Sequence, residues 1–252
     1  MFQYFFETKG TIPKDVGFQL FDGTHIFWLV LLVVLAVVGC LIYQRLGEKK
    51  RKIFRIVLAS LIVADELYKI IGLTALGQYT AGYLPLHLCS INIFIIAIHA
   101  IKPFRILDNF LYTICIPASF AALLLPNWTQ LPLLNFMHIH SATVHILLLL
   151  YPLILTVCGD LKPRFRDLPL SLALLVGMAI PVYGINVWLG KNFMFLMKPD
   201  GIAPLVFFEK LWGNHLLGYP VLIAAIVAVM YAPWLVMYFV AKKRKKRVEL
   251  TQ

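Results

Sequence analysis

Charged residues are scarce in this chain. Asp, Glu, Lys and Arg make up 14% of its 252 residues, whereas soluble domains carry about a quarter. Hydrophobic residues make up 61%, above the roughly one-half found in soluble domains. Little of the chain is left for a separate soluble domain, so the composition excludes a soluble enzyme and predicts an integral membrane protein.

Cysteine is also scarce. The four residues, Cys40, Cys89, Cys115 and Cys158, are too few and too scattered for a disulfide framework. Cys89 alone is expected near the outer face, and the others are interpreted as small apolar residues. The apolar runs are continuous rather than alternating, which argues against a β-barrel. Residues 1–23 lack a continuous apolar core, so no cleavable signal peptide is expected.

Seven apolar runs are long enough to cross a bilayer, which takes roughly 20 apolar residues per helix. The connections are short, so we expect an all-α integral membrane protein whose seven transmembrane helices pack in one bundle. It would have an extracytoplasmic segment at 1–23, a membrane domain at 24–240 and a basic cytoplasmic tail at 241–252. The predicted spans lie near 24–43, 53–76, 84–101, 106–125, 139–158, 168–189 and 216–240.

Basic residues gather on one side of this predicted topology. The chain has 23 Lys and Arg residues against 12 Asp and Glu residues, a net charge of +11. Most of the basic residues follow spans one, three and five or lie in the tail. Since positively charged loops stay in the cytoplasm, the N-terminus should lie outside and the C-terminus inside. No nucleic-acid partner is expected, because the charges flank membrane spans.

Two predicted spans open on the outer side with chemically reactive side chains. The third starts with Leu84-Pro85-Leu86-His87-Leu88-Cys89, and the fifth carries His138, His140, Ser141 and His145. Helical periodicity puts His138, Ser141 and His145 on one face and His140 on nearly the opposite one. His87 and Cys89 point apart on a regular helix. A Cys–His pair would therefore form between spans three and five.

These residues suggest nucleophilic catalysis. Ionisable groups inside a membrane are costly and mark functional sites. A free thiol is only slightly ionised at neutral pH, and a neighbouring imidazole can take its proton and activate it. We expect Cys89 to be the nucleophile, with His138 or His145 as base and His87 polarising a carbonyl. The alternative is that Cys89 is a small buried residue and the histidines form hydrogen bonds between helices.

Span two carries Asp65, Glu66 and Lys69 near its middle. Lys69 can pair with either carboxylate at helical spacing, so the group can neutralise itself inside the bundle. We expect it to line a functional cavity, with one carboxylate orienting a histidine or with Lys69 holding a lipid phosphate. Asn92 lies one turn from Cys89 and is expected to support the same site.

Two rival functions draw on the same residues. Several imidazoles near a carboxylate, or near the Cys89 thiolate, could hold zinc in a lipid hydrolase or amidase. The charges of span two would also suit a small proton-coupled transporter, although the sequence shows no paired halves with broken helices.

At these residues the chain resembles the YwaF-type bacterial integral membrane proteins and, more distantly, the eukaryotic transmembrane acyltransferase that makes polyunsaturated ether phospholipids. The resemblance rests on Leu84 to Cys89, on His138, His140 and His145, and on Asn192-Phe193-Met194-Phe195-Leu196 followed by Lys198-Pro199. Phe193 stands where that pattern would have Tyr.

The resemblance implies a lipid-handling enzyme in the plasma membrane of a bacterial cell. Cys89 looks like the cysteine thought to carry acyl transfer in the eukaryotic relative, whereas His138, His140 and His145 all remain candidates for the base. We expect a transacylase that passes an acyl chain from a membrane phospholipid or lipidated substrate, through Cys89, to a lyso acceptor at the outer leaflet. Asn192 and Lys198 join the supporting residues. No metal or other cofactor is expected, and the oligomeric state does not follow.

Overall fold

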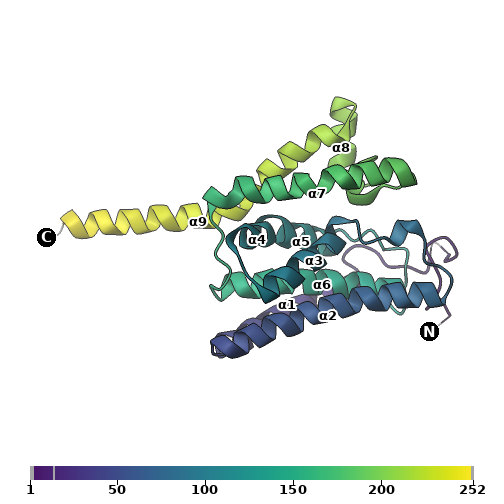
Figure 1. Ribbon diagram of the computed structural model, residues 1–252, viewed down its shortest axis with the longest axis horizontal. Helices are drawn as coiled ribbons and strands as arrows, with labels where there is room; N and C mark the ends of the chain where they lie inside the picture. Colours follow the sequence, from purple (N-terminus) through teal and green to yellow (C-terminus); the bar gives the residue numbers. More distant parts are fainter. Residues whose placement is uncertain (1–2, 14, 251–252) are drawn as a thin grey trace. The chain divides into compact units, whose positions relative to one another are not determined.

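All regular secondary structure in the described part of the chain is helical, which confirms the all-α class. The computed structural model describes residues 3–13 and 15–250, with the side chains of residues 234 and 236–250 left aside. Figure 1 labels the helices α1 Gly23–Gln44, α2 Glu48–Ala75, α3 Leu88–Ile101, α4 Arg105–Phe110, α5 Ile116–Leu124, α6 Phe136–Val157, α7 Leu168–Leu189, α8 Ala203–Trp212 and α9 Gly218–Leu250. Short turns of helix occur at η1 Ala81–Tyr83, η2 Leu111–Cys115, η3 Phe165–Asp167, η4 Phe193–Phe195 and η5 His215–Leu217.

Each predicted span corresponds to a helix or a continuous helical stretch. In the part of the chain that the structure describes, five stretches are long and apolar enough to cross a membrane. These are Gly23–Gln44, Arg105–Leu124, Phe136–Val157, Phe165–Leu189 and His215–Pro233. α2 is not among them, because three charged residues interrupt its apolar part. The count of seven spans is therefore still a prediction.

Within the span predicted at 84–101, the helix begins only at Leu88. Residues 84–87 precede the helix, and α3 has 14 residues. Pro85 has no N–H to donate and restricts the residue before it to extended conformations, so the helix starts only after it. At 1.5 Å per residue α3 is about 21 Å long, less than the roughly 30 Å of a hydrocarbon core. A crossing here would need the irregular segment before α3 as well.

The chain divides into two compact units, Met1–Met194 and Phe195–Gln252. In the first unit α6 is central and packs against α1, α2, α3 and α5. In the second unit α8 packs against η5 and α9. The boundaries predicted after residues 23 and 240 stay a prediction. The side chains of the predicted basic tail lie outside the described residues, and its backbone continues α9 to Leu250.

A cap covers the N-terminal ends of α1 and α6. It consists of residues 3–13 and 15–22 and the irregular segment 126–135. Its apolar core contains Ile12, Phe18, Trp128 and Leu131. Asn135 ties the two segments together, because its amide donates to the carbonyl oxygens of Tyr4 at 2.7 Å and Glu7 at 2.9 Å. The cap thereby fixes the position of Trp128 at the start of α6.

Asp22 caps α1 from within this segment. Its carboxylate accepts hydrogen bonds from the backbone N–H groups of His25 at 2.9 Å and Gln19 at 2.8 Å. These two bonds lower the pKa of the Asp22 carboxyl, the His25 bond being the stronger cause. A carboxylate at this end also complements the partial positive charge of the helix N-terminus.

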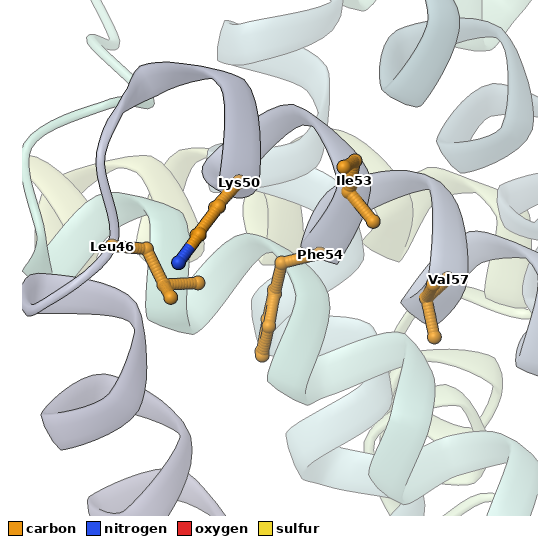
Figure 2. A pocket seen from close by; sticks show the side chains of 5 residues that line it. All are labelled: Leu46, Lys50, Ile53, Phe54 and Val57. Carbon is orange, nitrogen blue, oxygen red and sulfur yellow. The ribbon is translucent and has the colours of Figure 1, made fainter.

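Two polar networks hold the other end of the first unit. Asp160 accepts from Tyr43 Oη at 2.6 Å and pairs with Arg51 Nη1 at 2.8 Å, which joins α6 to α1 and α2. His99 lies between Asp108 and Tyr151, with 2.8 Å to each. A pocket of about 270 Å³ lies at this end. Figure 2 shows the side chains that line it, which are Leu46, Lys50, Ile53, Phe54 and Val57.

Candidate active site

Cys89 and His145 face each other across the contact between α3 and α6. The thiol and the imidazole are close enough for their side chains to interact directly. Cys89 is the second residue of α3, and His145 lies in the third turn of α6; both are half-buried. The pairing of Cys89 with a histidine of the fifth span stays a prediction, for which His145 is the candidate partner.

A hydrogen bond between His145 and the backbone of its own helix determines which ring nitrogen can accept a proton. Nδ1 lies 2.6 Å from the carbonyl oxygen of Ser141, one turn earlier in α6. A carbonyl only accepts, so Nδ1 must carry the proton in the neutral ring. Nε2 is left with a lone pair. This is the tautomer that a general base needs, and Ser141 supports it through its backbone rather than its hydroxyl.

Trp128 completes the surroundings of His145. Its indole stacks on the imidazole, with ring centroids 5.3 Å apart and planes at 16°. An indole face also favours a cation above it, so it would stabilise the imidazolium that forms when His145 takes a proton. This contact could not be predicted from the sequence, because Trp128 lies in the irregular cap and outside any helical periodicity.

The charged residues of α2 lie beside this pair. Lys69 Nζ is 2.5 Å from Glu66 Oε1, both buried, which is one of the two predicted pairings. Asp65 instead accepts from the Thr143 hydroxyl at 3.1 Å and lies 3.3 Å from His140 Nδ1. His140 Nε2 is 3.8 Å from Glu66 Oε2, so this histidine connects the two carboxylates.

This group acts on the Cys–His pair through charge. Lys69 is close enough to interact electrostatically with Cys89, and Asp65 with His145. The ammonium would stabilise a thiolate, and the carboxylate would stabilise an imidazolium. Thr143 was not singled out from the sequence, although it lies at helical spacing from His140 on the face that meets α2.

Two other predicted histidines, His138 and His87, contact residues outside the pair. His138 Nδ1 donates to the carbonyl oxygen of Leu131 at 2.9 Å, and its Nε2 accepts from Trp28 Nε1 at 2.9 Å. Both of its nitrogens are thus engaged in holding the cap and α1 to α6. His87 precedes α3 and lies edge-on to Phe193, with Nδ1 3.4 Å from the Met194 N–H.

The remaining predicted residues differ in position. Asn92 is buried one turn after Cys89. Asn192 follows α7 in the first unit, next to Phe193, whose backbone is held by Asn186. Lys198 belongs to the second unit. Among the side chains that the structure describes, no three His, Cys, Asp or Glu residues are arranged to hold a metal ion.

In a comparison with protein families, the TMEM164 family model matches residues 20–238, which is most of the chain. The chain belongs to the TMEM164 family. This is a family of multi-pass membrane proteins, and the match includes Cys89, His145 and the charged group of α2. No curated protein and no solved structure gave a match. The likeness to YwaF-type proteins and to the ether-phospholipid acyltransferase therefore stays a prediction.

Proposed function

We propose that this member of the TMEM164 family is a membrane lipid acyltransferase that forms an acyl-enzyme at Cys89. One observation carries the proposal. His145 contacts the Cys89 thiol while its Nδ1 is held by the Ser141 carbonyl, so the nitrogen with the lone pair is available to the thiol. A nucleophile, a base and a group that orients the base form the arrangement typical of covalent acyl transfer.

The residues support a balanced two-step reaction. His145 Nε2 takes the thiol proton, and the Cys89 sulfur attacks the ester carbonyl carbon of a glycerolipid. The acyl C–O bond then breaks, and the imidazolium returns its proton to the leaving alcohol oxygen, which gives a lyso product and a thioester. In the second step His145 removes the hydroxyl proton of a lyso acceptor, whose oxygen attacks the thioester. The released sulfur recovers the proton from His145.

The proposal includes a membrane topology with seven spans. α2 and α3 would be the two further spans, with the N-terminus outside and the C-terminus in the cytoplasm of a bacterial cell. Lys69 and Glu66 neutralise each other inside the unit, so α2 can cross despite its charges. The Cys–His pair would then lie below the cap, near the outer leaflet. An acyl chain could reach it laterally from the bilayer.

Labelling of Cys89 tests the proposed function. Purified protein in liposomes that contain a phospholipid radiolabelled in its acyl chain should acquire a label that hydroxylamine removes, because the intermediate is a thioester. Cys89→Ala should carry no label. Cys40→Ala is the matched control and should label like the natural protein, since Cys40 lies near the other end of α1. Absence of label, or equal labelling of Cys89→Ala, would contradict the proposal.

A further inference from the structure

Asn92 differs from the other fully buried asparagines of the protein. Among the described residues, Asn92, Asn109, Asn135 and Asn186 are all 0% exposed. The last three use both ends of their amides to hold backbone groups: Asn109 binds Arg164, Asn135 binds Tyr4 and His138, and Asn186 binds Phe193.

In contrast, neither the Nδ2 nor the Oδ1 of Asn92 has a hydrogen-bond partner in the described part of the chain. Buried polar groups in folded proteins almost always have a partner, and an exception calls for an explanation. Asn92 holds no backbone in place, so capping or loop fixation does not account for it. Its amide is free to bind something that enters the site.

The position of Asn92 on α3 identifies what it would meet. Residues three apart on a helix lie on one face, and their side chains tilt toward the helix N-terminus. The amide of Asn92 therefore points back along the face of Cys89, one turn away.

We propose that Asn92 is a catalytic residue whose amide N–H binds the carbonyl oxygen of the acyl group attacked by Cys89. This inference rests on the proposed function and assigns it an oxyanion donor. When the sulfur adds to the carbonyl carbon, the electron pair of the C=O bond moves to the oxygen. The Asn92 Nδ2–H donates to that oxygen, and the pair returns when the C–O bond of the leaving alcohol breaks. The substrate oxygen supplies the missing partner of the buried amide.

The test compares acylation rates of variants in a single turnover. Asn92→Leu keeps the approximate volume and removes both donors, so label should appear at Cys89 about 10² to 10³ times more slowly, as for loss of an oxyanion donor in other enzymes. Alkylation of Cys89 by iodoacetamide should stay unchanged, because the thiol and its base are intact. Thr113→Val is the matched control, since Thr113 is also fully buried with an unpartnered hydroxyl. It should label at the natural rate.

The outcomes separate this inference from the proposed function. If the natural protein labels at Cys89 and Asn92→Leu labels within threefold of its rate, Asn92 is not an oxyanion donor and the acyltransferase stands. If alkylation slows in parallel with acylation, Asn92 acts on the site structure instead, and the inference is wrong. If the natural protein itself gains no label at Cys89, the proposed function falls. Asn92→Ala replaces Asn92→Leu should the larger side chain impair folding, with the same expected rate loss.

Discussion

At the scale of single residues, hydrogen bonding gives three histidines of one helix different properties. His138 uses one nitrogen as donor and the other as acceptor, so its neutral ring is fully satisfied. His140 lies between two carboxylates of α2. His145 has Nδ1 held by the Ser141 carbonyl oxygen, and its side chain interacts with the Cys89 thiol. Depending on its neighbours, a histidine of α6 thus holds other segments in place, pairs with carboxylates or acts as a base.

Substitution of His145 and His138 should separate catalysis from stability. We expect His145→Gln to slow acylation of Cys89 by about 10² to 10⁴, the usual contribution of a general base. We expect His138→Leu to acylate normally and to unfold at a lower temperature, because it leaves a buried carbonyl and the Trp28 N–H without partners, at about 1–3 kcal/mol each. Radiolabel incorporation and thermal unfolding in detergent measure the two effects. Equal loss of labelling in both variants would contradict the assignment.

The sequence predicts which residues of α6 share a face, but not how far along the helix each one lies relative to Cys89. His138 and His145 are seven residues apart, so they share a face and looked equivalent as bases. Along the helix they are separated by about 10 Å, at 1.5 Å per residue. Which of them reaches Cys89 depends on where α3 begins, and Pro85 delays that start. The cap contacts that fix Trp128 beside His145 join chain segments more than 100 residues apart, so no local sequence pattern indicates them.

At the scale of elements, close packing of α2 on α6 brings the charged group to the Cys–His pair. Gly72 of α2 faces the ring of Phe136 at the start of α6, and a Cβ added there would lie 2.3 Å from the ring. Phe136 is buried among Phe5, Phe6 and Tyr68, so the ring has little space to move. Gly72 therefore allows the two helices to approach.

Gly72→Ala should destabilise the protein. The added methyl overpacks the contact, which typically costs about 1–3 kcal/mol, so the thermal midpoint in detergent should fall. Gly177→Ala is the matched control: it lies in α7 with no atom within 4 Å of an added Cβ, and it should be neutral or stabilising. Adding Phe136→Leu to Gly72→Ala should restore part of the loss. A midpoint for Gly72→Ala equal to that of Gly177→Ala would contradict this contact.

Some helix boundaries and pairings could be predicted from the sequence, and others could not. The long apolar helices α1, α6 and α7 were predicted within a few residues, because hydrophobicity alone defines them. The π-helical turn at Leu111–Cys115 was not predicted, since a turn of this kind depends on tertiary contacts. In α2 the pairing of Glu66 with Lys69 followed from helical spacing, whereas Asp65 found partners on α6 that spacing cannot reveal.

At the scale of the whole molecule, the number and direction of membrane crossings depend on α2. α2 has 28 residues and is about 42 Å long at 1.5 Å per residue, enough to cross a hydrocarbon core of roughly 30 Å. Its first turns are basic, and Arg51 and Arg55 pair with Asp160 at the end of α6. Its other end leads toward Ala81 and the start of α3. If α2 spans the bilayer, these two ends face different compartments.

Cysteines placed on either side of α2 should therefore react from opposite sides of the membrane. Glu48 and Ala81 are both exposed and flank the helix. In a background without the natural cysteines, we expect Ala81→Cys to react with a membrane-impermeant maleimide in intact cells. Glu48→Cys should react only after the membrane is opened, because positively charged loops stay in the cytoplasm. Both variants should label equally in permeabilised cells, which controls for intrinsic reactivity. Labelling of both from outside would mean that α2 does not cross, and labelling of Glu48→Cys alone would reverse the orientation and move the Cys89 site to the inner leaflet.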